Sequence, residues 1–239
     1  MGNRTTWGVL GGMGALASAE LLKTIYEDNG AVHEQELPVV VVLSDPTFPD
    51  RTECLLTGHS ELLLARFSRA IDTLVAAGCG QIVICCMTIH ALLPMLRPQQ
   101  RAAIVPVSDV LLRSAKQSGR RNLMLCSTGS RRLKLFETHP LWPSVADKIL
   151  FLDDDDQERL HEMIYRVKTG VCGVPEFAFL AGLRARYDAG FIAGCSEIHL
   201  VMKRAQEQGR EAEFPCIDPF REIAGRIRAS RIRVADAVI

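Results

Sequence analysis

The sequence predicts an α/β protein made of two similar doubly wound parallel-sheet domains, with the active site in the cleft between them. The first observation is that short apolar runs alternate with amphipathic helical patterns along the chain, as in parallel sheets covered by helices. The second is an internal repeat, in which segment 82–90 aligns with 191–199 after a shift of 109 positions. Cys86 then falls on Cys195, so we expect each half to present a cysteine at the carboxyl end of a strand, where ligands of such sheets bind.

The first half begins with an apolar run that enters a glycine-rich turn, 11–14, followed by a helical pattern. Such a turn suits a bound anion. It lacks the spacing of a dinucleotide fingerprint and is followed by no Walker lysine, which favours a carboxylate over a nucleotide. We expect strands at 5–10, 38–43 and 81–86, and helices at 16–29, 60–77 and 106–118.

The second half repeats this alternation from Arg121 onward, with a turn at 127–130 in the place of the glycine-rich turn. The four aspartates at 153–156 precede a helical pattern, where acidic residues are favoured, so we expect them to be solvated and not to bind metal. We expect strands at 122–126, 148–152 and 191–195, a last short strand within 213–219, and helices at 159–167, 176–188 and from Phe220. The predicted domains are 1–105 with 215–239, and 106–214.

Composition excludes several classes of function. The 239 residues carry zero formal net charge, with a pI of about 7.0, so no nucleic-acid or acidic-membrane partner is expected. No apolar segment approaches the roughly 20 residues that span a bilayer, and the N-terminus has no signal-peptide pattern. These features predict a cytoplasmic protein. The eight cysteines form no Cys-x-x-Cys pair, so neither a zinc site nor a disulfide scaffold is expected.

Two cations and one turn have open interpretations. Arg51 lies in the loop 44–52 that we expect after the 38–43 strand, and it is either a surface residue or a bidentate clamp for a carboxylate. Lys168 ends a helical pattern, where compensation of the helix dipole is a sufficient explanation. Thr128 either caps the next helix or contacts a ligand carboxylate.

Two cysteines that face one carbon from opposite sides suit the inversion of a stereocentre. One sulfur removes the proton from one face while the other supplies a proton to the opposite face. An unperturbed thiol has a pKa of about 8.5, so thiol and thiolate coexist near neutrality after modest tuning. His90 and the pair Glu197 and His199 lie within one helical turn of the cysteines and could set their protonation, although at least one histidine fits helix packing equally well.

The chain resembles the aspartate/glutamate racemase family of cofactor-independent, two-cysteine amino-acid racemases. The matching motifs are Gly11-Gly12-Met13-Gly14, Pro49-Asp50-Arg51-Thr52, Cys86-x-Thr88-x-His90, the 125–128 turn, Lys168-Thr169-Gly170, Gly194-Cys195-Ser196-Glu197 and Ile217-Asp218-Pro219. They occur in family order and cover nearly the whole chain. The resemblance implies two similar α/β domains, with the last segment returning to the first. It also implies no cofactor and, as is common in the family, a homodimer. No metal ligand set is evident in the sequence, so no metal is expected.

The resemblance also implies the site residues. Cys86 and Cys195 would be catalytic. Arg51 and Lys168 match positions that recognise the substrate's side-chain carboxylate, and Thr88, Thr128 and Ser196 match positions that hold the α-carboxylate. Met13, Met87 and Glu197 lie in the same motifs and complete the expected substrate-binding set.

One position departs from the family pattern. Met87 stands where the first motif has asparagine, so an amide that donates and accepts hydrogen bonds is replaced by an apolar thioether. We therefore expect free aspartate and glutamate to be poor substrates. The expected function is racemisation or epimerisation of aspartate, glutamate or a derivative. The alternatives are cis–trans isomerisation or decarboxylation of a small carboxylic acid, or carboxylate binding without catalysis. Retention of Cys86 counts against a decarboxylase.

Overall fold

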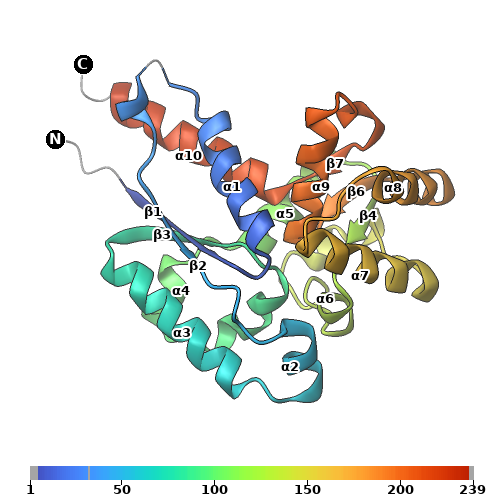
Figure 1. Ribbon diagram of the computed structural model, residues 1–239, viewed down its shortest axis with the longest axis horizontal. Helices are drawn as coiled ribbons and strands as arrows, with labels where there is room; N and C mark the ends of the chain where they lie inside the picture. Colours follow the sequence, from blue (N-terminus) through green and yellow to red (C-terminus); the bar gives the residue numbers. More distant parts are fainter. Residues whose placement is uncertain (1–4, 32, 237–239) are drawn as a thin grey trace.

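The computed structural model describes residues 5–31 and 33–236, with side chains described up to residue 228. Two parallel sheets lie side by side (Figure 1). The first has the strand order β2-β1-β3, and the second the order β5-β4-β6-β7. The strands are β1 (Thr6–Gly11), β2 (Val40–Ser44), β3 (Cys79–Ile84), β4 (Asn122–Leu125), β5 (Ile149–Leu150), β6 (Gly190–Ala193) and β7 (Cys216–Ile217). The predicted α/β class with two parallel-sheet domains is confirmed.

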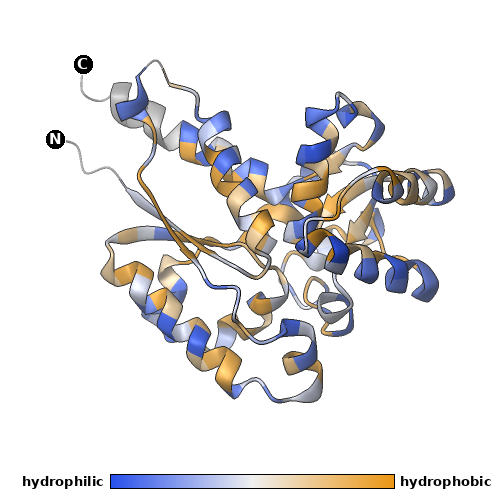
Figure 2. Cartoon of the chain, viewed as in Figure 1, coloured by the Kyte–Doolittle hydropathy of each residue, from blue (hydrophilic) through white to orange (hydrophobic). Residues whose placement is uncertain are grey.

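The two sheets show the internal repeat in their topology. In each half the first strand along the chain lies in the centre, with the second strand on one side and the third on the other. β3 ends at Ile84 and β6 ends at Ala193, so Cys86 and Cys195 each lie two residues beyond equivalent strand ends. The strands form because β-branched and other apolar residues fill them, as the orange colouring of Figure 2 shows. All four residues of β4 are buried, as expected for a strand covered by helices on both faces.

Helices connect the strands and cover the sheets. The α-helices are α1 (Ala15–Asp28), α2 (Arg51–Thr57), α3 (Glu61–Ala76), α4 (Pro98–Ala103), α5 (Val107–Ser118), α6 (Thr128–Arg132), α7 (Asp154–Lys168), α8 (Val174–Tyr187), α9 (Ser196–Glu207) and α10 (Pro219–Asp236). Short 3₁₀ helices are η1 (Glu34–Glu36), η2 (Thr88–Met95), η3 (Trp142–Ser144), η4 (Ala146–Lys148) and η5 (Glu211–Glu213). No helix in the described ranges is long and apolar enough to cross a membrane.

The C-terminal segment contacts both halves. β7 pairs with β6 in the second sheet, whereas α10 packs against α1 of the first half and against α5 (Figure 1). Helix α9 of the second half also packs on α1. The two halves therefore share a helical interface on one side, while the domain boundaries at 105 and 215 stay a prediction.

Two local expectations were wrong. The segment expected as a loop around Arg51 contains a helix, because the Asp50 side chain accepts a hydrogen bond from the Glu53 backbone N–H at 2.9 Å and caps α2. The four aspartates are not all solvated. Asp153 caps α7, but Asp156 is 2% exposed and forms an ion pair with Arg186 at 2.8 Å. Burial of Asp156 follows from α8 packing beside the start of α7, which the local sequence does not reveal.

The repeat also differs between its copies. Cys195 is followed directly by the α-helix α9, whereas Cys86 is followed by the 3₁₀ helix η2. η2 contains Pro94, which cannot supply the backbone N–H that an α-helix needs at that position. The side chains that follow the two cysteines are therefore arranged differently.

Candidate active site

The glycine-rich turn after β1 packs tightly against its neighbours. Gly12 has φ of +91°, and a Cβ there would lie 2.3 Å from a backbone atom of Asp45, so only glycine fits. The Gly12 N–H donates to Ser18 Oγ at 3.0 Å, and Ser18 Oγ donates to Gly14 O at 2.8 Å. Ser18 therefore uses the Gly12 N–H, and the turn brings Met13 to the cavity and Gly14 against Glu197.

Cys86 and Cys195 line one small cavity between the two halves. Their residues are 5% and 7% exposed. The space admits about 10 Å³, which is room for about one water molecule. The lining residues are Met13, Asp50, Arg51, Thr52, Cys86, Met87, Thr88, Ser127, Lys168, Cys195, Ser196 and Glu197.

Cys195 has a carboxylate as its direct partner. Its thiol donates to Glu197 Oε2 at 2.9 Å, and the Ser196 hydroxyl donates to the same oxygen at 3.1 Å. Burial raises the pKa of Cys195 well above its usual value, and the Glu197 carboxylate raises it further, while Lys168 opposes the shift. Cys195 therefore holds its proton at neutral pH in this arrangement.

Glu197 is 1% exposed, and one of its oxygens lacks a partner. Among the described residues, Oε1 has no hydrogen bond. A Cβ at Gly14 would lie 2.4 Å from this oxygen, so the absence of a side chain at Gly14 leaves room for it. An unpaired buried carboxylate oxygen is costly, and at this position it is available to a proton or to a ligand's donor.

Cys86 has a cation as its neighbour. Burial lowers the pKa of Arg51, but Cys86 and Asp50 more than offset this and leave the pKa raised. The guanidinium is held by backbone carbonyls, since Nη1 donates to Pro49 O at 3.0 Å and Nη2 donates to Met13 O at 3.3 Å. Its Nε has no partner among the described residues. The two cysteines thus lie in opposite surroundings, one beside a positive charge and one beside a negative charge.

A polar contact between α2 and α7 closes the cleft. The Tyr165 hydroxyl of α7 donates to Asp50 Oδ2 at 2.6 Å, and burial together with the Asp50 carboxylate raises the pKa of Tyr165. Lys168 Nζ lies 4.2 Å from the centre of the Tyr165 ring. Close packing adds to the closure, because a Cβ at Gly129 would lie 2.7 Å from Thr52 Oγ1. Segments of the two halves therefore meet over the cavity.

Three hydroxyl groups meet across the cleft. Thr88 Oγ1 shares hydrogen bonds with Ser127 Oγ at 2.9 Å and Ser130 Oγ at 3.1 Å. Ser127 also caps α6 by accepting from the Ser130 backbone N–H at 3.2 Å. Hydroxyls donate and accept, so this cluster can reorient toward a ligand carboxylate.

Met87 packs away from solvent at the same place. It is 1% exposed, lines the cavity and belongs to the larger apolar core, which is built mainly from the second half. Its backbone lies in the helical region and starts η2. The side chain therefore joins the apolar core of one half to the cavity.

A family model for Asp/Glu/Hydantoin racemases matches residues 10–140. The chain belongs to the Asp/Glu/Hydantoin racemase family. Similar folds include an aspartate racemase from Picrophilus torridus, with 18% identity, a TM-score of 0.78, and coverage of 95% of this chain and 94% of that one. An aspartate racemase homologue from Pyrococcus horikoshii has 17% identity, a TM-score of 0.66 and coverage of 95% and 99%. A glutamate racemase from Francisella tularensis has 14% identity, a TM-score of 0.63 and coverage of 99% and 83%.

The sequence of this member of the racemase family predicts ten site residues. Nine of them line the cavity. The exception is Thr128, whose N–H donates to His161 Nδ1 at 3.5 Å and which does not line the cavity. Its neighbour Ser127 lines it instead. Asp50 and Thr52 also line the cavity and were not expected there. Their positions on either side of Arg51 in one motif were the available signal.

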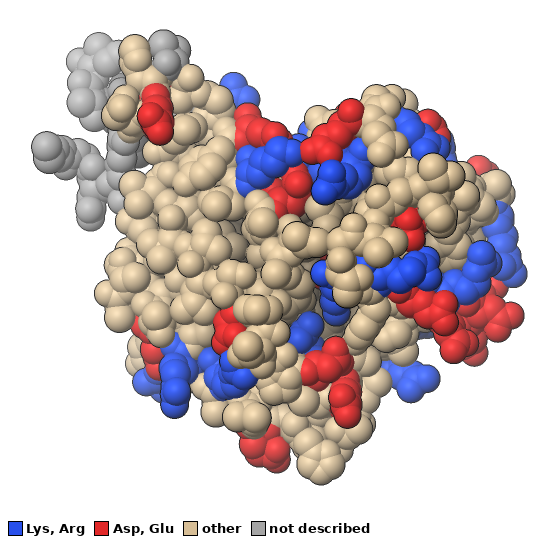
Figure 3. Space-filling model, in the orientation of Figure 1, with Lys and Arg blue, Asp and Glu red and all other residues tan. Residues whose placement is uncertain are grey.

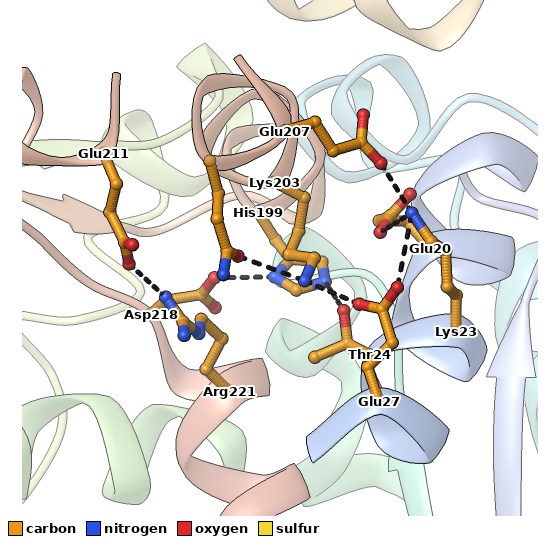
Figure 4. A network of polar contacts seen from close by, with 11 residues as sticks. Glu20, Lys23, Thr24, Glu27, His199, Lys203, Glu207, Glu211, Asp218 and Arg221 are labelled. Atoms are coloured by element: carbon orange, nitrogen blue, oxygen red, sulfur yellow. Dashed lines mark hydrogen bonds and ion pairs between the residues drawn. The ribbon is translucent and has the colours of Figure 1, made fainter. Parts of the chain in front are cut away.

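Among the described residues, neither of the two histidines near the cysteines hydrogen-bonds to a cysteine sulfur. His90 Nδ1 donates to Cys86 O at 2.8 Å, and burial lowers the pKa of His90 to about 4, so the ring is neutral. His199 is buried and its Nδ1 hydrogen-bonds Asp218 Oδ2 at 2.6 Å, while Nε2 hydrogen-bonds Thr24 Oγ1 at 3.2 Å (Figure 4). His199 therefore ties α9 to α1 and to the turn before α10.

Ion pairs surround this buried histidine and join the halves. Lys203 of α9 donates to Glu27 of α1 at 2.8 Å, and Lys23 of α1 contacts Glu207 of α9 at 2.5 Å (Figure 4).

The described residues hold no group of three or more His, Cys, Asp or Glu side chains that could bind a metal ion. Figure 3 shows acidic and basic side chains beside one another over the right and lower parts of this face, whereas its left part is mostly uncharged.

Proposed function

We propose that the protein is a cofactor-independent racemase or epimerase of an acidic amino acid or a derivative, acting by proton transfer between Cys86 and Cys195. The observation that carries the proposal is the pair of cysteines at equivalent strand ends, lining one cavity between the halves. Membership of the racemase family supports the reaction class. A reaction that needed one cysteine would not account for two equivalent thiols on the same cavity.

The opposite surroundings of the cysteines assign them different starting roles. Arg51 places a positive charge beside Cys86, and a neighbouring cation stabilises a thiolate. Cys195 is protonated, and its thiol donates a hydrogen bond to Glu197. In one direction the Cys86 thiolate removes the Cα proton from one face, and Cys195 delivers its proton to the other face. The products are the opposite enantiomer, a Cys86 thiol and a Cys195 thiolate.

The enzyme must return to its starting state after each turnover. Glu197 Oε2 contacts the Cys195 sulfur, and Oε1 is unpaired. The return requires Cys86 to release the proton that it took and the Cys195 thiolate to gain one, with no net change in the protons on the enzyme. We infer that Glu197 relays this proton, accepting it at the unpaired Oε1 by way of water and then donating it to the Cys195 sulfur. General acid–base groups contribute about 10²–10⁴-fold to rate when they are positioned in this way.

The remaining polar groups can bind the substrate's carboxylates. Arg51 and Lys168 are the cations that line the cavity, and we assign them to the side-chain carboxylate. Thr88, Ser127 and Ser196 offer hydroxyls, and we assign them to the α-carboxylate, with Ser127 in place of Thr128. Met87 offers apolar contact where an amide would hold polar substituents.

Substrate entry requires the cleft to widen. About 10 Å³ cannot contain an amino acid, so the halves must separate where Asp50 meets Tyr165. The proposed domains, 1–105 with 215–239 and 106–214, allow such a motion about the two segments that connect them. A homodimer and a cytoplasmic location complete the proposal.

The decisive experiment follows hydrogen exchange at Cα. The protein is incubated in deuterium oxide with aspartate, glutamate and their N-acylated or otherwise substituted derivatives, and exchange and chirality are followed by NMR and chiral chromatography. We expect one compound to exchange and to racemise. Exchange in none of these acids, with the protein folded, would contradict the proposal.

A further inference from the structure

A second cavity lies at the opposite end of the second sheet. Its volume is about 660 Å³, which is within the usual range for small-molecule sites. Asn122 and Gly190, which begin β4 and β6, line it, together with Ser118 at the end of α5 and Pro215 before β7. The cysteine cavity lies beyond the other ends of the same strands.

The two cavities are separated by the length of the strands. β4 leads from Asn122 at the second cavity to Ser127 at the cysteine cavity, a path of roughly 16 Å in an extended chain. β6 leads from Gly190 to Cys195 in the same way. A molecule in the second cavity would therefore not touch the cysteines.

Three arginines line the second cavity: Arg120, Arg121 and Arg184. Within the described part of the chain, none of them forms an ion pair with a carboxylate. The side chain of Arg184 donates to the backbone carbonyl of Glu213. Arg186, two residues further along α8, shows the contrast, because it pairs with Asp153 and Asp156.

The local negative charge does not balance these cations. Asp188 is the carboxylate that lines the cavity. The C-terminal ends of α5 and α8 add about half a negative charge each. The positive charge of the three guanidinium groups exceeds this negative charge by about one elementary charge, although the whole chain has zero formal net charge. The excess is a property of this cavity and not of the whole surface.

The lining combines the cations with apolar surface. Ala189, Cys216 and Ile217 contribute to the wall. The Asn122 amide is held in place, since Nδ2 donates to Arg120 O at 2.8 Å. Arginine binds carboxylates and phosphates in a bidentate manner, and an apolar wall suits the carbon skeleton of an organic ligand.

We propose that this cavity binds a small organic anion with at least two negative charges, through Arg120, Arg121 and Arg184. A phosphate ester and a dicarboxylate share this chemistry. The site is separate from the cysteine cavity and does not depend on the proposed reaction.

Isothermal titration calorimetry on the full-length protein tests the proposal, with pyrophosphate and succinate as probes and sodium chloride at matched ionic strength as the blank. We expect at least one probe to bind. Arg121→Gln, Arg184→Gln and the double variant Arg120→Gln/Arg121→Gln should each weaken that binding by about tenfold or more, since a hydrogen bond to a charged group contributes about 1.5–3 kcal/mol. The probe that binds more tightly identifies the phosphate or the dicarboxylate class.

Two control variants separate this site from other causes. Arg69→Gln removes an exposed arginine that has no ion pair among the described residues, and it should leave binding unchanged. Arg51→Gln removes a cation of the cysteine cavity, and it should not prevent binding at the second cavity. The proposal is overturned if neither probe binds, if Arg69→Gln weakens binding as much as Arg121→Gln, or if Arg51→Gln alone abolishes it.

Discussion

The thiol of Cys195 donates a hydrogen bond to Glu197 over 2.9 Å, and both residues are buried. The carboxylate stabilises the protonated thiol and raises the pKa of Cys195, after the larger effect of burial. The protonation of Cys195 therefore depends on Glu197. A substitution of Glu197 can change this protonation while the catalytic sulfur stays in place.

Glu197→Gln should move the pH dependence of the reaction to lower pH. The amide cannot repel a thiolate, so the pKa of Cys195 should fall and its deprotonation should occur at lower pH than in the wild type. The pH profile of kcat measured separately with each enantiomer checks this. The limb assigned to Cys195 should shift, and Glu197→Asp should restore part of the wild-type profile. An unchanged profile in both directions would show that Glu197 does not control the thiol.

Cys86→Ser and Cys195→Ser should each lower racemisation by about 10²–10⁴-fold, because a hydroxyl is a far weaker acid than a thiol. Each variant should still exchange the Cα proton of one enantiomer in deuterium oxide, with opposite preference. Cys79→Ser is the matched control, since Cys79 is buried but does not line the cavity. It should change thermal stability more than turnover. Normal racemisation by either active-site variant rules out the two-base mechanism.

Met87→Asn should raise the turnover of free aspartate or glutamate and lower that of the preferred substrate. An asparagine amide can donate to and accept from polar groups that a thioether leaves unpaired, and such groups shift selectivity by orders of magnitude. Steady-state kinetics with both acids and with substituted derivatives measures the change. If the wild type already racemises free aspartate or glutamate with kinetics unaffected by the substitution, Met87 does not determine specificity.

Tyr165→Phe should raise KM by about tenfold with a smaller effect on kcat, because it removes a hydrogen bond to the charged Asp50 that closes the cleft. Stability should change little, since the Tyr165 side chain lies at the edge of the cleft. Tyr187→Phe removes a hydroxyl that contacts Asp156 at 3.3 Å, and it serves as the control. Equal KM values for the two variants would mean that the Asp50 contact does not contribute to closure.

Asp218→Asn should lower the free energy of unfolding by about 3 kcal/mol, since it disrupts a buried pair with His199. Although burial raises the pKa of Asp218, His199 and backbone N–H groups outweigh this effect and lower it below its usual value. Because the folded-state pKa is lower than the unfolded-state pKa, the stabilisation is present above the unfolded pKa and is lost as pH falls through the folded pKa.

Urea unfolding of the wild type and of Asp218→Asn from neutral pH into acid measures this contribution. The wild type should lose stability in acid more steeply than the variant, and the difference between them should shrink. Asp72→Asn removes an exposed ion pair with Arg97 and should cost at most about 1 kcal/mol. If the free energies of unfolding of the wild type and of Asp218→Asn change with pH in parallel, the Asp218–His199 pair does not make the proposed pH-dependent contribution.

Much of the fold follows from local patterns. The β-branched run around Val40 predicts β2, and the repeat predicts that Cys86 and Cys195 occupy equivalent strand ends. These predictions succeed because apolar runs between glycine-rich turns can be buried in one way, as parallel strands under helices. The family motifs placed Met13 and Ser196 at the cleft, and these residues lie two and three residues beyond a strand end.

The polar details of the site depended on contacts between distant segments. Thr88 meets Ser127 across the cleft at 2.9 Å, although the two residues are 39 positions apart. Local sequence could not choose Ser127 over Thr128, because a rotation of one residue about the turn decides which side chain faces the cavity. It also could not reveal that Asp50 caps α2 and receives the Tyr165 hydroxyl from another helix.

The sequence by itself determined the fold class, the repeated strand ends and most of the residues that line the cleft, because each depends on hydrophobic periodicity or on a short motif. The tertiary structure decided the different surroundings of the two cysteines. Arg51 lies beside Cys86 because α2 packs against η2 and α6, and the burial that raises the pKa of Cys195 comes from packing of both halves. Desolvation and charge pairing depend on distances in space, and those are set by how the helices pack.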